Sequence, residues 1–293
     1  MKYLLLILCC VSMLKNTHAQ EEEPTNSVTA SISQWQLGNA FTLVTDANVR
    51  EKPSTQSMVV TKLPIGSPIL IEEVTTDSFV VNGFKAPWCK ISFDNNAKKG
   101  YLWGGFIATV VLKNIDIIEN GVNSSENTEG VTFLGGVSAW DEKKYKMTMQ
   151  LRAMRGTKEI TRYEFISTGD LSYDCTLKIE DGGNFKNVLK TLTFSTGYPA
   201  CGYPWSDNLI FYTKDKTLTK VLETTSVGDG GVMYASENYI LPYDKGGIAG
   251  HIILTSDQAE FEEKGTEMIM RNQKYGIKLY KWDGLKLIKI PVK

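Results

Sequence analysis

The sequence has few of the residues on which many enzyme sites and compact secreted scaffolds depend. Its 293 residues include five cysteines and two histidines, and 32 Lys and Arg nearly balance 33 Asp and Glu. So few cysteines exclude a small disulfide-dense scaffold. The net charge of −1 provides no overall basic field, so we expect no nucleic-acid partner. The length and the apolar fraction of 42% fit a globular chain of about two domains.

The longest apolar run of the chain lies at its N-terminus. A basic start is followed by an apolar stretch, Tyr3 to Leu14, and then by Thr17-His18-Ala19, with small residues at the positions that a signal peptidase needs. This order predicts a secretory signal peptide over residues 1–19, cleaved after Ala19. A membrane span needs about 20 apolar residues, more than this stretch contains. A lipoprotein anchored through Cys9 or Cys10 is a minor alternative.

Removal of the signal peptide would leave a secreted or periplasmic chain with one histidine, His251. Disulfides can form in such a compartment. We consider two states for Cys175 and Cys201: a disulfide closing a loop of about 25 residues, or two separate thiols. Cys89 is expected to be an unpaired thiol in a core. We expect no metal site, no cofactor and no membrane span in the mature chain, and the sequence does not indicate an oligomeric state.

The rest of the sequence favours β-structure. Residues 20–40 are rich in Glu, Ser, Thr and Asn, which predicts a mobile tail. From Phe41 onward, short runs of Val, Ile, Thr, Phe and Tyr are separated by Gly, Asn, Asp and Pro, as in an all-β fold. Between Met147 and Ala153 apolar residues occupy every second position, so one face of that strand should lie in a core.

Two hairpins can be predicted from their turn residues. One turn falls near Lys214 to Lys216. The other falls at Asp283-Gly284, a dipeptide typical of a type I′ turn, in which both central residues have positive φ.

Three segments between residues 41 and 108 occur in a characteristic order. Ala47 to Ser54 contains Asn-Val-Arg before a proline turn. Val59 to Ile71 contains a strand, a glycine-marked turn and a second strand. Trp88 to Ile91 reads Trp-Cys-Lys-Ile, and Gly100 to Ile107 begins Gly-Tyr-Leu-Trp. Together they resemble the bacterial SH3 (SH3b) family. A longer excursion between Ile71 and Trp88 departs from the family pattern.

The resemblance implies a small SH3-like barrel over residues 41–110. Its expected core consists of Val49, Leu63, Ile69, Ile71, Ile91 and Ile107. Domains of this family recognise cell-wall peptides, or other peptide and protein ligands, through an aromatic-lined surface. The resemblance therefore gives four candidate ligand-binding residues: Arg50, Trp88, Tyr101 and Trp103. The alternative is that the two tryptophans belong to the barrel core and that Arg50 makes structural hydrogen bonds.

Residues 111–293 resemble no family that we recognise. We expect a larger antiparallel, sandwich-like β-domain there, packed against the barrel because no flexible linker separates the two. Asp174-Cys175 superficially resembles the nucleophile pair of the NlpC/P60 cell-wall peptidases, with His251 as a possible base. The alternating pattern around Cys175 instead predicts a buried strand, which disfavours a reactive thiolate.

The sequence thus predicts a non-catalytic recognition protein of the cell envelope. Its partner would be a cell-wall peptide, as in peptidoglycan binding, or an envelope protein. Two alternatives remain at this point: a cysteine peptidase-like cell-wall hydrolase with its site in the C-terminal domain, and a structural or assembly protein of the envelope.

Overall fold

The computed structural model describes residues 28–33, 35–119, 122–123, 130–168, 174–198, 200–264 and 267–291. The predicted signal peptide, its cleavage site and the first residues of the predicted tail lie outside this part. The described chain is nearly all strand, arranged in antiparallel sheets, so the predicted all-β fold class is confirmed. No helix in the described ranges is long and apolar enough to cross a bilayer.

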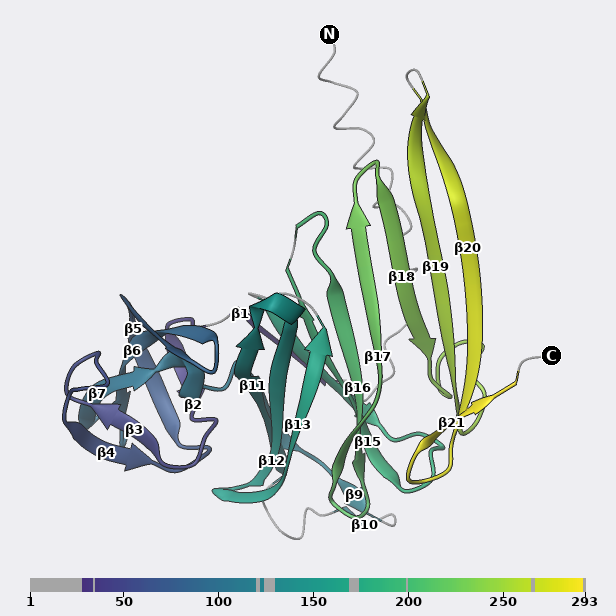
Figure 1. Ribbon diagram of the computed structural model, residues 1–293. Coiled ribbons are helices and arrows are strands. Elements are labelled where there is room, and N and C mark those ends of the chain that lie inside the picture. The colour runs from purple at the N-terminus through teal and green to yellow at the C-terminus, as the bar shows by residue number, and fades with distance from the viewer. Residues whose placement is uncertain are drawn as a thin grey trace.

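The first unit is a six-stranded barrel with strand order β2-β5-β6-β7-β3-β4 (Figure 1). Its elements are β2 Gly38–Phe41, β3 Ala47–Arg50, β4 Val59–Leu63, β5 Pro68–Val81, β6 Phe84–Phe93, β7 Lys98–Trp103 and the short 3₁₀ helix η1 Gly104–Phe106. The predicted core is confirmed, with Leu63 partly buried at its margin and Val49, Ile69, Ile71, Ile91 and Ile107 buried.

The excursion noted in the sequence is a long hairpin. β5 and β6 extend beyond the barrel and join through Asn82 and Gly83, both with positive φ. Asn-Gly suits a type I′ turn because both residues adopt this conformation at low cost. The hairpin carries Phe79 and Phe84 out of the barrel sheet toward the rest of the molecule.

The second unit is built from a four-stranded sheet, β13-β12-β11-β8, and a nine-stranded sheet, β1-β14-β15-β16-β17-β18-β19-β20-β21. The smaller sheet contains β8 Val110–Ile115, β11 Val131–Asp141, β12 Lys146–Arg155 and β13 Lys158–Thr168, with a 3₁₀ turn, η3, at Glu142–Lys144. The larger sheet contains β1 Val28–Ser33, β14 Asp174–Asp181, β15 Val188–Gly197, β16 Trp205–Thr213, β17 Leu218–Asp229, β18 Met233–Ile240, β19 His251–Lys264, β20 Glu267–Trp282 and β21 Leu287–Ile290. A two-stranded ribbon consists of β9 Ile118–Glu119 and β10 Val122–Asn123.

The smaller sheet packs on β14, β15 and β16 to form a sandwich with one continuous core. Met147, Met149, Leu151 and Ala153 are buried there, as the alternation predicted. Phe133 lies at the centre, with its ring 5.5 Å from that of Tyr212 in an edge-to-face arrangement. Such pairs contribute beyond the area they bury.

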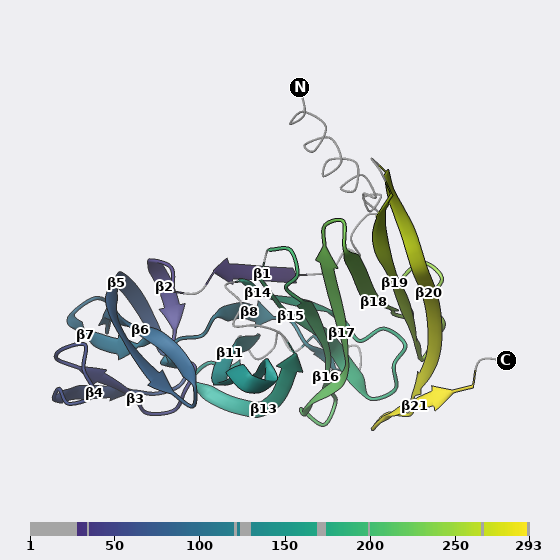
Figure 2. The same cartoon turned by 45° about the horizontal axis from the view of Figure 1, so that its top comes forward.

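The larger sheet buries both faces of β16. Ile210 and Tyr212 point into the sandwich core, whereas Leu209 and Phe211 point into a second cluster. That cluster is covered by side chains from β19, β20 and the loop after β18, so the far strands of the sheet cover the outer face of its near strands. Figure 2 shows the sheet turning in this way from β15 to β20.

Two tyrosines link these layers. The Tyr239 hydroxyl lies 2.6 Å from Oγ1 of Thr193, and the Tyr243 hydroxyl lies 2.8 Å from Oγ1 of Thr191. Both threonines belong to β15, and both tyrosines are partly buried. Burial raises the pKa of both phenols, so they stay neutral and able to donate.

The segment for which a mobile tail was predicted contains two strands. β1 pairs with β14, placing Val28 opposite Ile179, and β2 pairs with β5 in the barrel. In β1, apolar residues alternate with hydroxyl residues, the period of a strand, although the overall composition is polar. The prediction of a mobile tail from composition alone was therefore wrong for the part of this segment that the structure describes.

Both predicted hairpins are present, but one turn differs from its expected type. β16 and β17 join near Lys214 to Lys216 as expected. The β20–β21 loop spans Asp283 to Lys286, and only Gly284 within it has positive φ. The Asp283 carboxylate accepts backbone hydrogen bonds from Leu285 and Lys286, both at 2.8 Å. The Asp283 side chain thus closes the turn in place of the predicted type I′ conformation. The same two bonds lower the pKa of Asp283.

The sandwich core yields a test of stability. Phe133→Ala removes a fully buried ring at its centre and should lower the free energy of unfolding by about 3–5 kcal/mol. Ile166→Ala is the matched control, because that side chain is 55% exposed on β13; it should change the value by less than about 0.5 kcal/mol. Urea unfolding measures both, and equal losses would contradict this account of the core.

Candidate ligand-binding site

The two candidate tryptophans lie inside the molecule. Trp88 and Trp103 sit opposite each other on β6 and β7 and are 4% and 5% exposed. Both belong to the same apolar cluster as the sandwich core. The indole nitrogen of Trp103 donates to the carbonyl oxygens of Phe79 and Ala86, at 3.0 and 3.1 Å. Neither indole is available to a ligand.

The β5–β6 hairpin covers this aromatic face. Phe84 contacts Trp103 edge-to-face at 6.0 Å and stacks on Trp35 at 6.1 Å. Gly104 and Gly105 make room for the rings: a Cβ on Gly104 would come within 2.4 Å of the Trp35 ring, and one on Gly105 within 2.2 Å of Trp103. The Trp-Gly-Gly sequence therefore serves aromatic packing rather than ligand contact.

Tyr101 and Arg50 lie at the barrel surface. They pair across β3 and β7, and both are half-buried. The Arg50 guanidinium donates to the carbonyl oxygen of Ser57 at 2.6 Å, which fixes the loop between β3 and β4. Arg50 thus makes a structural hydrogen bond, and the four candidates do not form one exposed ligand surface.

The barrel is docked on the sandwich at two places. At the hairpin tip, the backbone N–H of Trp140 donates to the carbonyl oxygen of Asn82 at 3.0 Å. Gly83 lies close against the backbone of Trp140. Nearer the barrel, Leu43 packs against Gly136 and belongs to a small apolar cluster that is separate from those described above. These contacts agree with the prediction that the two parts pack together.

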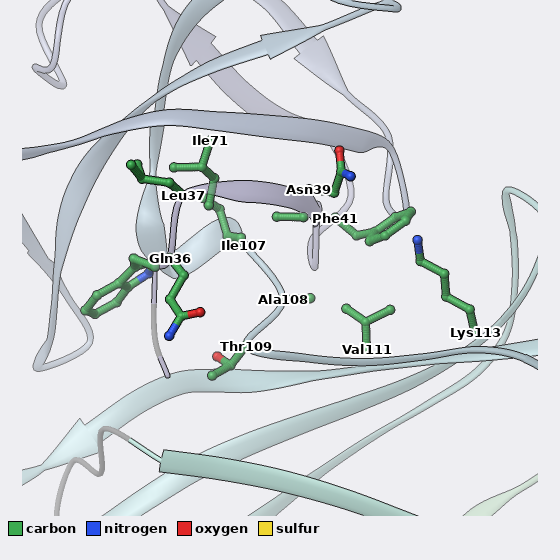
Figure 3. Close-up of a pocket in the computed structure, with 12 residues that line it drawn as sticks. Gln36, Leu37, Asn39, Phe41, Ile71, Ile107, Ala108, Thr109, Val111 and Lys113 are labelled. Atoms are coloured by element: carbon green, nitrogen blue, oxygen red, sulfur yellow. The ribbon is translucent and has the colours of Figure 1, made fainter. Parts of the chain in front are cut away.

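A cavity of about 240 Å³ opens beside this second contact. It lies between the segment from Trp35 to Phe41 and the segment from Ile107 to Lys113 (Figure 3). Two contacts hold these segments together. Thr42 and Ile107 form an antiparallel bridge, and the backbone N–H of Ala108 donates to the carbonyl oxygen of Phe41 at 2.9 Å. The cavity therefore belongs to both units at once.

The cavity combines an apolar wall with one cation. Its apolar side chains include Leu37, Phe41 and Val111. The Lys113 ammonium lies 4.2 Å from the centroid of the Phe41 ring, and Figure 3 shows the two side chains facing each other at one end. A cation–π contact of this kind holds an ammonium in place while leaving its other donors available. The amides of Gln36 and Asn39 also line the cavity.

Sequence reasoning did not identify this cavity. Its two walls are about 70 residues apart along the chain, and each reads as an ordinary strand segment. No motif marks Lys113 or Phe41, since only the pairing next to Thr42 brings them together.

The predicted cysteine–histidine pair is not brought together. Cys175 lies fully buried on β14, facing the sandwich core. His251 begins β19, five strand positions away in the sheet order, and its Nδ1 lies 2.8 Å from the carbonyl oxygen of Ala249. Cys175 faces the sandwich core, whereas β19 contributes Ile252 to the cluster on the other face of the sheet. This particular pair cannot act as nucleophile and base.

The alternative of a disulfide between Cys175 and Cys201 is also not realised. Cys201 is an exposed free thiol in the loop after β15, whereas Cys175 is buried. Cys89 is a buried free thiol, as predicted. In the described part of the chain, no group of three or more His, Cys, Asp or Glu side chains is arranged to hold a metal ion.

Comparison with known proteins agrees with the barrel. Residues 45–108 match the model of the family described as Bacterial SH3 domain, which confirms the resemblance seen in the sequence. No family model matches the C-terminal part. No curated protein and no solved structure matches the chain. The family match suggests a binding module associated with the cell wall and fits a protein outside the cytoplasm.

The hairpin tip can be tested through Gly83. A Cβ there would lie 2.1 Å from the Trp140 carbonyl oxygen, at a φ of +76°. Gly83→Ala should therefore destabilise the fold by at least about 1 kcal/mol. Gly246→Ala is the matched control because Gly246 has a similar φ of +82° and nothing lies within 4 Å of its Cβ position. Thermal unfolding of the two variants gives the comparison; equal midpoints would argue against the docking contact.

The cysteines should differ sharply in reactivity. Burial raises the pKa of Cys89 to about 12, so at pH 8 only about one thiol in ten thousand is ionised. Native protein treated with iodoacetamide should be modified at exposed Cys201, with Cys89 and Cys175 protected. Peptide mass spectrometry assigns the labelled sites, and equal labelling of Cys89 and Cys201 would contradict the described burial.

Proposed function

We propose that this protein is a secreted or periplasmic, non-catalytic recognition protein of the cell envelope. In this proposal the cavity between the barrel and the first strand of the sandwich binds a cell-wall peptide or a segment of an envelope protein. The observation that supports it most is a cation held at the rim of a partly apolar cavity next to a barrel that matches a binding-module family.

The cavity limits the size of the ligand. Pockets for drug-sized molecules measure about 300–1,000 Å³, and this one measures about 240 Å³. One residue of a peptide fits such a space. Lys113 favours a carboxylate at one end, and the apolar wall around Leu37 favours an aliphatic side chain at the other. A short peptide with a carboxylate next to an aliphatic side chain meets both requirements.

A structural or assembly role is the second candidate. The aromatic face expected to bind ligands is occupied by the protein's own β5–β6 hairpin. A domain whose binding face is filled internally can serve to build a larger rigid unit. Binding of a wall fragment at the junction cavity would decide between the two proposals.

The first experiment is co-sedimentation of the protein with purified peptidoglycan. We expect the protein to pellet with the polymer, and Lys113→Glu to reduce the bound fraction at least tenfold, because the substitution places a carboxylate where the ligand's carboxylate would lie. The fraction of wild-type protein that pellets should fall as the ionic strength rises, because Lys113 is exposed and salt screens its attraction to a carboxylate.

Lys62→Glu provides the matched control. Lys62 is an exposed lysine of β4 that does not line the cavity. Reversing the charge of Lys62 should leave the bound fraction within about twofold of the wild-type value, because an isolated surface charge contributes little. Absence of pelleting by the wild type, or an equal effect of both substitutions, would reject the cavity as a wall-peptide site and favour the assembly role.

A further inference from the structure

β20 leaves a long stretch of its outer edge unpaired. β19 covers one side of the strand along most of its length, whereas β21 covers the other side only from Leu279 to Trp282. Figures 1 and 2 both show the β19–β20 hairpin extending beyond its neighbours. Between Glu267 and Lys278, no strand in the described part of the chain pairs with this edge.

Two backbone features define the regular part of this edge. β21 ends at Ile290, and Pro291 follows, a residue without an N–H to continue the pairing. At the other end, Asn272 has a φ of +49°, where the pairing of β19 with β20 shifts register. The six residues from Gln273 to Lys278 therefore present an uninterrupted extended edge, with backbone groups available for a further strand.

The side chains along this edge divide by face. Tyr275 and Ile277 point to one face and are 71% and 64% exposed. Lys274 and Lys278 point to the opposite face and are exposed; within the described residues neither ammonium has an ion-pair partner. A strand added here would meet apolar side chains on one face and cations on the other.

This distribution disfavours pairing with a second copy of the chain. Antiparallel pairing of two β20 edges that sets Tyr275 against Ile277 of the other copy also sets Lys274 against Lys278. Like charges directly opposite each other in a sheet are destabilising. Lysines on an edge strand are a common protection against self-association, and here they leave the edge open to a strand of opposite charge.

We infer that the Gln273–Lys278 edge of β20 is a second docking surface, which binds an extended protein segment by strand addition. The partner segment alternates acidic and apolar side chains. Its backbone completes the hydrogen bonds of the edge, its carboxylates meet Lys274 and Lys278, and its apolar side chains cover Tyr275 and Ile277. This surface lies on the C-terminal sheet and is independent of the junction cavity.

A synthetic ten-residue peptide that alternates Glu and Val tests this inference with the full chain. Fluorescence anisotropy should show saturable binding, at least tenfold tighter than that of a peptide alternating Lys and Val. Amide hydrogen exchange should slow at residues 273–278 in the presence of the first peptide. Equal affinity for the two peptides, or no protection at this edge, would overturn the inference.

Substitutions on β20 provide the matching comparisons. Lys274→Glu combined with Lys278→Glu should weaken binding of the Glu–Val peptide at least tenfold. Lys281→Glu, on the part of the strand that β21 covers, should change it less than twofold. The parent, the double variant and Lys281→Glu are all compared in a Lys113→Glu background, because the Glu–Val peptide also meets the requirements of the junction cavity. Circular dichroism confirms that each variant is folded. If sedimentation instead shows a dimer that is lost in the double variant, the edge serves self-association and the proposed partner is wrong.

Discussion

The arrangement of this protein depends on the burial of one aromatic face of its barrel. Trp88, Trp103 and Phe84 lie in the same apolar cluster as the sandwich core, so the barrel and the sandwich share buried surface. Removing a buried tryptophan or phenylalanine typically costs about 3–5 kcal/mol, a large part of the net stability of a domain. The cavity at the junction depends on the same docking, because its two walls come from the two units.

Docking also changes what the SH3-like barrel offers to a ligand. A free-standing barrel would expose the aromatic side chains that family resemblance marks for binding. Here a hairpin inserted between Ile71 and Trp88 fills that face and hydrogen-bonds to Trp103. In the proposed function, recognition takes place instead at the seam between the units, where Lys113 from β8 meets Phe41 from β2.

The sequence was sufficient for the fold class, for the barrel and for the alternating core positions of β12, since these depend on local periodicity and turn residues. It also contained a signal that went unused: Asn82-Gly83, which marks the tip of the docking hairpin. Three features had no local signal. The partner of strand β1 lies about 150 positions later in the chain, Cys175 and His251 are separated by the winding of one sheet, and the cavity joins two distant segments.

The pairing of β1 with β14 has a consequence for the order in which the chain is made. Ribosomes deliver the N-terminal part first, yet Val28–Ser33 has its partner in Asp174–Asp181. More than half of the polypeptide must therefore emerge before its first strand can join the sheet. During that interval the barrel can form from nearer residues, while β1 waits for a partner strand that has not yet been made.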